Sequence, residues 1–141
     1  MFSKAPIPGQ VKTRLAAALG AAGAAELHRR LVRHTLEKAL TAGVGPVELC
    51  CAPHARHGFF ADCAAAYGVT LTEQGEGDLG ARMSRVFERG APAVLIGCDA
   101  PALTADDIAA AARALAAADV ALTPAEDGGY MLIALRAPAP E

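Results

Sequence analysis

The sequence predicts a single α/β domain in which helices cover both faces of a mostly parallel sheet. Helical segments alternate with short apolar runs along the chain, and a length of 141 residues fits one domain. Hydrophobic residues make up 53% of the chain, yet aromatic residues make up only 4% and Trp is absent. Alanine-rich runs supply much of this apolar content, which favours helices packed closely on a sheet.

The first predicted helix spans residues 13–41, with a break or kink near Gly20 and Gly23, and Gly43 as its end signal. Apolar and small residues recur along it at helical spacing, so one stripe is expected to face the core. The predicted stripe consists of Leu27, Leu31, Thr35, Leu36, Ala39 and Leu40.

Three further helices have clear start or stop signals. Residues 54–67 end at a glycine, Asp78 caps a helix running to about residue 89, and Thr104 with Asp107 forms a capping box for a helix over 104–118.

Apolar or β-branched runs between these helices predict the strands. They cover residues 47–52, 69–73, 93–97, 120–123 and 130–135, and a strand before the loop at Lys4 is absent or only two or three residues long. Since no helix separates the last two strands, one of them is expected to pair antiparallel or to lie at an edge.

Composition excludes several functional classes. No apolar run reaches the ~20 residues that cross a bilayer, no signal segment opens the chain, and a net charge of −2 argues against nucleic-acid binding. The basic residues are nevertheless concentrated early, since residues 1–38 hold seven Lys or Arg and two Asp or Glu. This imbalance indicates either an anion site beside a cation site, or chance, because several of these bases lie on a solvent face of a helix.

Cysteines and histidines give no catalytic or zinc-binding spacing. The four cysteines form no CxxC pair, so they are expected to be small, buried, reduced residues of a cytoplasmic protein, and the histidines are expected at the surface. The residues concerned are Cys50, Cys51, Cys63, Cys98, His28, His34, His54 and His57.

The first stretch whose residues could bind a ligand is the proline- and glycine-rich loop FSKAPIPGQVKTRL. Gly9 allows close approach of a ligand, and Lys12, Thr13 and Arg14 are predicted in the first helical turn, where unpaired amides favour anions. Lys4 could reach the same anion. An ordinary loop with solvated bases is the alternative.

Two more stretches follow predicted strands. In QGEGDLGARM, glycines around a helix start permit a flat group or phosphate to approach, with Arg82 nearby; simple capping by Asp78 and a solvated Arg82 is the alternative. In VLIGCDAPAL, Asp99 comes directly after a buried strand, where α/β sites form, and a carboxylate there suits Mg²⁺. A turn or strand-end cap is the alternative for Asp99.

The fourth stretch is PAEDGGYMLIAL. Asp-Gly-Gly between two apolar runs is by itself a hairpin turn signal. Because it follows the next strand edge after Asp99, Asp127 could instead be a second carboxylate in the same cleft.

In their order, the motifs FSKAPIPGQVKTRL, QGEGDLGARM, IGCDAPAL and PAEDGGYMLIAL resemble the DUF2064 family, described as rSAM/selenodomain-associated transferase 1 or as glycosyltransferase-like. That family is similar to phospholactate guanylyltransferase and to molybdopterin-cofactor nucleotidyltransferases. The resemblance implies the nucleotide-diphospho-sugar transferase fold, which is GT-A-like and Rossmann-like.

The resemblance also implies a set of site residues. Nucleotide phosphates would be held by Lys4, Gly9, Lys12 and Arg14, and the nucleobase would lie against Gly77, Leu79 and Gly80. Asp99 would bind Mg²⁺ or Mn²⁺, and Asp127 would complete the metal or acceptor site.

The expected function is therefore transfer from a nucleotide or nucleotide-sugar donor to a small-molecule acceptor, with Lys12, Asp99 and Asp127 as the catalytic residues. The chemistry is either glycosyl or nucleotidyl transfer. Members of the family usually carry a full apolar strand before the first motif and continue past the last one, so the resemblance predicts a domain over 1–141 that is truncated at both ends. The alternative is a non-catalytic or degenerate nucleotide-binding module.

Overall fold

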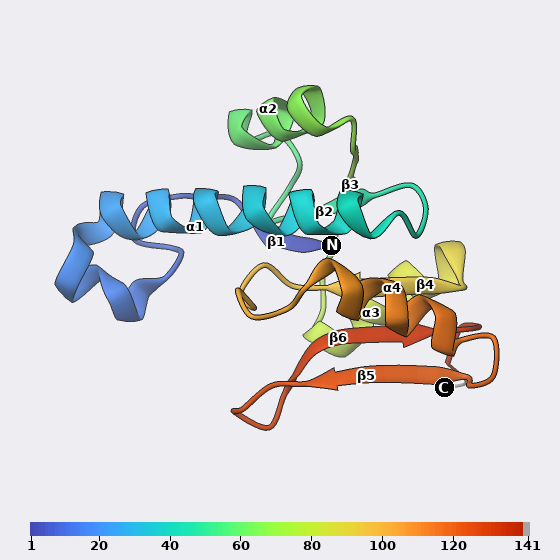
Figure 1. Ribbon diagram of the computed structural model, residues 1–141. Helices are drawn as coiled ribbons and strands as arrows, with labels where there is room; N and C mark the ends of the chain where they lie inside the picture. The colour runs from blue at the N-terminus through green and yellow to red at the C-terminus, as the bar shows by residue number, and fades with distance from the viewer. Residues whose placement is uncertain (140–141) are drawn as a thin grey trace.

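The computed structural model describes residues 1–139, and in this part of the chain the strands form two three-stranded sheets (Figure 1). The first sheet is parallel, in the order β1-β2-β3, and the second is antiparallel, in the order β4-β6-β5. The strands are β1 (Phe2–Lys4), β2 (Glu48–Ala52), β3 (Thr70–Glu73), β4 (Ala93–Ile96), β5 (Val120–Pro124) and β6 (Tyr130–Leu135). The fold is thus α/β, as predicted, and β5 and β6 pair antiparallel with β5 at an edge.

The sequence predicted one mostly parallel sheet, and the division into two sheets is a correction to that picture. β1 has three residues and pairs with β2, and its pairing with β4 is not among the hydrogen-bonded ladders of the described residues. β6 reverses direction because it returns from β5 through a tight turn, and it lies between β4 and β5.

The longest helix is α1 (Ala16–Ala42), which a 3₁₀ turn, η1 (Thr13–Leu15), precedes. As predicted, it is kinked at Gly20, whose φ of 70° is outside the helical range, and it ends at Gly43 in the left-handed conformation. The buried side of α1 differs from the predicted stripe, since Leu40 is exposed. The residues that face the core are Ala24, Ala25, His28, Val32, Thr35 and Leu36.

The other helices are α2 (Gly58–Tyr67), α3 (Leu79–Gly90) and α4 (Ala105–Ala114). Asp78 caps α3 and Thr104 with Asp107 forms the capping box of α4, both as predicted. α2 begins four residues later than predicted, because the side chain of His57 accepts a hydrogen bond from the Phe59 amide and forms the N-cap. α4 ends at Ala114, where the chain continues into a turn rather than to residue 118.

Helices cover both faces of the second sheet, and alternate side chains of β4 and β6 pack against them. Ile96 and Leu132 pack with Ile108 of α4, whereas Leu95 and Leu135 pack with Phe87 of α3. The larger of these clusters also contains Leu36 of α1 and Leu49 of β2. The two sheets therefore share one hydrophobic core, although within residues 1–139 no ladder hydrogen bonds join them.

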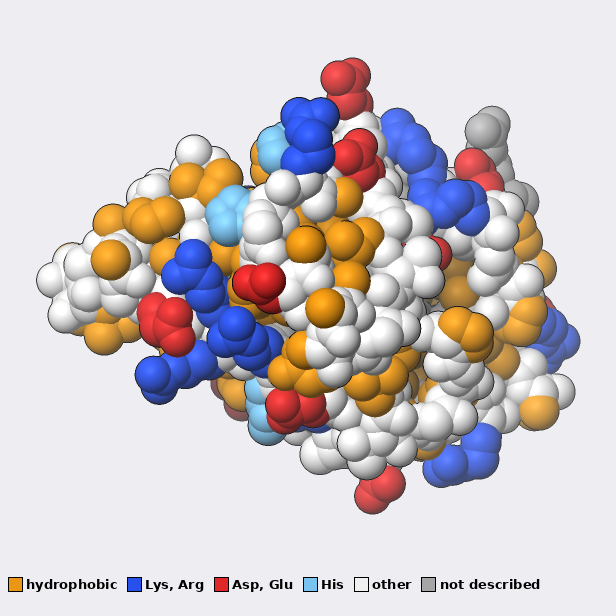
Figure 2. Space-filling view, turned by 90° about the horizontal axis from the view of Figure 1, so that it is seen from above, with side chains coloured by type: hydrophobic (Ala, Val, Ile, Leu, Met, Phe, Trp, Pro, Cys, Tyr) orange, Lys and Arg blue, Asp and Glu red, His pale blue; other side chains and the backbone are white. Residues whose placement is uncertain are grey.

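All four cysteines are buried and free, as predicted. None of the helices in the described part of the chain combines the length and the hydrophobicity that crossing a bilayer requires. At the start of α1 the molecule projects outward and carries exposed hydrophobic side chains, among them Leu15 and Leu19 (Figure 2).

Candidate functional site

A cavity of about 610 Å³ lies between the two sheets. Its walls come from β1, residues 10–13, the start of α3, the end of β4 with the three residues after it, and the start of β6. Segments from both ends of the chain thus meet around one hollow, at the carboxyl ends of β1 and β4, which is where ligands bind in α/β folds.

Two opposite charges meet at this cavity. The ammonium group of Lys12 donates a hydrogen bond to Asp99 Oδ1, so the loop after β1 is linked to the segment after β4. The Lys12 side chain is 17% exposed and that of Asp99 is 71% exposed. Neither charge is fully buried, so the two side chains can separate to contact a ligand.

The backbone of Lys12 is unusual. Its φ is 51°, and it is the only non-glycine residue with a positive φ in the described chain. A side chain in this left-handed region costs free energy, and such residues cluster at functional sites. The conformation turns the loop into η1 at the edge of the cavity.

Asp99 is held in its charged form. Burial would raise the pKa of this carboxyl, but the hydrogen bond and charge of Lys12, with smaller effects of Cys98 and His28, outweigh it and leave the pKa below its ordinary value. An ionised, accessible carboxylate of this kind suits a hard divalent cation.

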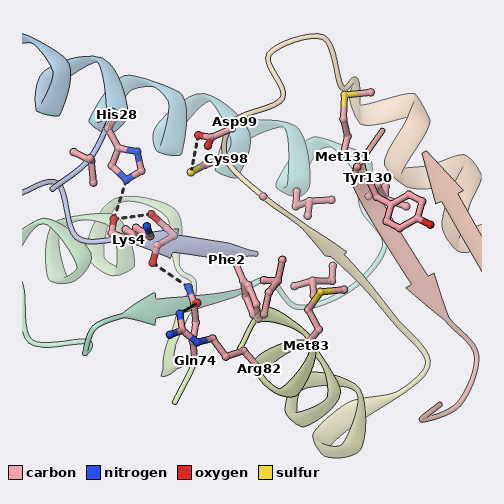
Figure 3. A pocket seen from close by; sticks show the side chains of 18 of the residues that line it. Phe2, Lys4, His28, Gln74, Arg82, Met83, Cys98, Asp99, Tyr130 and Met131 are labelled. Atoms are coloured by element: carbon pink, nitrogen blue, oxygen red, sulfur yellow. Dashed lines mark hydrogen bonds between the residues drawn. The ribbon is translucent and has the colours of Figure 1, made fainter. Parts of the chain in front are cut away.

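His28 and Cys98 line the same wall (Figure 3). His28 comes from α1, and its Nε2 lies 2.8 Å from the Lys4 carbonyl oxygen, while Cys98 Sγ lies 3.6 Å from Asp99 Oδ1. Burial, together with the charge of Lys12, lowers the pKa of His28 despite its hydrogen bond to Lys4. The imidazole is therefore neutral near pH 7.

The loop over residues 74–78 reaches the cavity through Gln74 and is held in one shape by hydrogen bonds. Gln74 is buried, and its Nε2 donates to the carbonyl oxygens of Cys50 at 3.0 Å and Ser3 at 3.3 Å. Arg82 Nε donates to the Gly77 carbonyl at 2.9 Å, and Arg85 donates to the Gln74 carbonyl at 3.2 Å. This loop is thus pre-ordered before any ligand binds.

The structure brings together about half of the residues that the sequence singled out. Those that line the cavity are Lys4, Lys12, Thr13, Leu79, Arg82 and Asp99. Those outside its lining are Gly9, Arg14, Gly77, Gly80 and Asp127.

Asp127 lies in the turn between β5 and β6, where its carboxylate accepts a hydrogen bond from the Gly129 amide at 2.9 Å. The hairpin signal of Asp-Gly-Gly is confirmed. From that motif, Gly129 and Tyr130 reach the cavity instead, and Tyr130 is 63% exposed there.

Sequence reasoning missed several lining residues, among them Phe2, His28, Gln74, Cys98 and Tyr130. All of these except His28 are inside motifs that were recognised, so their adjacency to the predicted site residues could have indicated them. His28 was expected at the surface, and that prediction is wrong, since the residue is only 4% exposed. No local pattern on α1 indicates that His28 of this helix lines the cavity.

Comparison with known families adds an identity to this geometry. The model of the DUF2064 family, which is described as an uncharacterized protein conserved in bacteria, matches residues 35–141. The chain belongs to the DUF2064 family. The matched range contains three of the four motifs, and the loop with Lys12 precedes it.

Among solved structures, the chain is similar to a candidate nucleotide-diphospho-sugar transferase from Desulfovibrio desulfuricans G20, with a TM-score of 0.82 and 32% identity. The match covers 96% of this chain and 61% of that one, so the chain spans about three-fifths of that protein. No curated protein matches the chain. The DUF2064 chain therefore has the nucleotide-diphospho-sugar transferase fold.

Proposed function

We propose that this DUF2064 protein transfers a group from a nucleotide-diphosphate donor, a nucleotide-sugar in the first instance, to a small-molecule acceptor. The observation that carries the proposal is the Lys12–Asp99 ion pair, which joins two segments 87 residues apart beside the cavity. The likeness in fold to a candidate nucleotide-diphospho-sugar transferase supports the choice of donor.

The pair supplies the two charges that a diphosphate needs. On donor binding, Lys12 would exchange Asp99 for a phosphate oxygen, and Lys4, exposed on the same wall, would approach from the other side. The freed carboxylate of Asp99 would then hold Mg²⁺ or Mn²⁺, because such ions bind to one or two carboxylates together with substrate phosphates. When bound, that ion neutralises charge on the leaving diphosphate.

The remaining walls suit the other parts of the donor and the acceptor. Gln74, Leu79 and Arg82 line the cavity beside the pre-ordered loop, and the nucleobase would lie against them. Tyr130 presents an exposed aromatic ring at the opposite side, where it can cover a sugar or acceptor. Asp127 is engaged in its turn, and its role in metal binding remains a prediction.

Product analysis tests the proposal and separates the two chemistries. The full chain is incubated with a panel of nucleotide-sugars or nucleoside triphosphates, Mg²⁺ and phosphorylated or sugar acceptors. Glycosyl transfer releases a nucleoside diphosphate, whereas nucleotidyl transfer releases pyrophosphate. Asp99→Asn should abolish either product, and Asp62→Asn, a change of an exposed carboxylate on α2, should not.

Donor binding is measured separately by thermal shift with and without Mg²⁺. Saturation at 100 times Kd should stabilise the fold by about 2.7 kcal/mol. Binding that is independent of the metal, with no turnover of any donor, would favour the non-catalytic nucleotide-binding module instead.

A further inference from the structure

The imidazole of His28 has one nitrogen whose role the donor site does not explain. Nε2 lies 2.8 Å from the Lys4 carbonyl oxygen, and since a carbonyl oxygen only accepts, Nε2 must carry the proton. In a neutral ring the lone pair is then on Nδ1. Nδ1 is buried and has no hydrogen-bond partner among the described residues.

A buried lone pair without a partner is costly, so it calls for a ligand. His28 is 4% exposed, and in Figure 3 the ring edge that does not face Lys4 is turned toward Cys98 and Asp99. One ring nitrogen, Cys98 Sγ and a carboxylate oxygen of Asp99 all lie within 4.8 Å of one another. Two segments far apart in the sequence, α1 and the stretch that follows β4, thus bring three ligand atoms close together.

One separation among these atoms matches the ligand spacing around a tetrahedral metal. Zinc bonds of about 2.0–2.3 Å give ligand–ligand separations of roughly 3.3–3.8 Å. The distance of 3.6 Å between Cys98 Sγ and Asp99 Oδ1 lies in that interval. The Nε2–carbonyl hydrogen bond also has the form that fixes the tautomer of metal-bound histidines.

We propose that His28 Nδ1, the Cys98 thiolate and the Asp99 carboxylate bind one Zn²⁺ ion in the free protein, with a fourth position open to solvent. The Sγ–Zn bond forms as the thiol proton leaves to solvent, and the Lys12 ammonium releases Asp99 Oδ1. Imidazole and thiolate select a borderline-soft ion over Mg²⁺, which prefers oxygen ligands.

The inference does not rest on donor chemistry. It shares Asp99 with the proposed donor site, but it concerns the protein without a nucleotide. A failure to find any transfer product therefore leaves it intact, and a failure to bind Zn²⁺ leaves the Mg²⁺-dependent transfer intact.

The test uses Co²⁺ as a spectroscopic substitute for Zn²⁺. The full chain is treated with a chelator, dialysed and titrated with Co²⁺ in the absence of nucleotide, and then Zn²⁺ is added in competition. We expect a thiolate-to-cobalt charge-transfer band in the near ultraviolet that saturates at about one ion per chain. Zn²⁺ should remove the band, and Mg²⁺ at the same concentration should not.

Variants assign the band to the three ligands. Cys98→Ser should abolish it, and His28→Gln should weaken Co²⁺ affinity by at least about 100-fold, because even changes around the ligands cost about 10–100-fold. Cys63→Ser, which changes another buried free cysteine, should leave the band unchanged. Asp99→Asn alters an accessible side chain, so its effect on affinity can be read even if a buried variant fails to fold.

Three results would overturn the site: no thiolate band in the wild-type chain, a band that persists in Cys98→Ser, or Co²⁺ affinity unchanged in both His28→Gln and Asp99→Asn.

Discussion

The parallel and antiparallel halves of this DUF2064 protein are held together by different interactions. In the half formed by β1, β2 and β3, buried polar groups take part, with Gln74 bonded to the Ser3 and Cys50 carbonyls. In the half formed by β4, β5 and β6, the buried strand residues are all hydrophobic, namely Leu95, Ile96, Leu132, Ala134 and Leu135. Both halves are packed in the shared core, but the first half adds buried side-chain hydrogen bonds that the strands of the second half lack among the described residues.

This difference matters for the site because each half contributes one charge. Lys12 follows β1 of the parallel half, and Asp99 follows β4 of the antiparallel half. The halves are joined by α1, which packs against both α2 and α4. The candidate site therefore exists only when the shared core is assembled, and the following variants test each part of that dependence.

Removing shared core volume should have the largest effect. Leu36 of α1 is fully buried in the cluster that contains residues of both halves. Leu36→Ala should lower the free energy of unfolding by about 2–5 kcal/mol, because it creates a cavity that the surroundings fill only in part. Urea denaturation followed by circular dichroism measures it. Leu40→Ala, at an exposed position of the same helix, is the control and should cost far less.

Breaking the Lys12–Asp99 ion pair should reduce activity strongly and stability only slightly. Lys12→Ala should reduce transfer by about 10²–10³-fold, as expected for loss of a group that stabilises developing negative charge. It should change the free energy of unfolding by less than about 1 kcal/mol, because the Asp99 side chain is 71% exposed and an ion pair with such a solvated partner contributes little. Steady-state kinetics and denaturation are compared with Arg30→Ala, an exposed cation of α1. Equal effects of both variants on turnover would refute the role of Lys12.

Breaking the polar network should affect the parallel half alone. Gln74→Leu removes the donor to two buried carbonyls and should cost about 1–3 kcal/mol. Hydrogen exchange should rise first at amides of β1 and β2 rather than β6. Uniform acceleration in both halves would show that the network stabilises the whole core. Gln10→Leu, at an exposed position, serves as the matched change.

The smallest expected effect is at the start of α4, on the antiparallel half. Thr104→Ala removes the side chain that accepts from the Asp107 amide at 3.1 Å. The free energy of unfolding should fall by about 1 kcal/mol, as for other N-caps. Thr104→Ser keeps the hydroxyl and should preserve stability in the same thermal melts. A loss as large in the serine variant would show that the methyl group, not the cap, matters.

The local features of the chain were predictable because their causes are local. The kink at Gly20, the end of α1 at Gly43, the caps at Asp78 and Thr104 and the Asp-Gly-Gly turn each depend on a few neighbouring residues. The placement of Asp99 after a buried strand followed in the same way. The predicted start of α2 was wrong because the His57 side chain forms the N-cap, and histidine rarely signals a cap.

By itself, the sequence determined the element types, the caps, the family and the two charged segments, since each is written in contiguous residues. Only the tertiary structure decided that β1 and β4 belong to separate sheets with a cavity between them, that Lys12 pairs with Asp99, and that His28 turns inward beside Cys98. The physical reason is that these contacts join residues about 70 to 90 positions apart, and their partners are chosen by how the shared core packs, which no local pattern encodes.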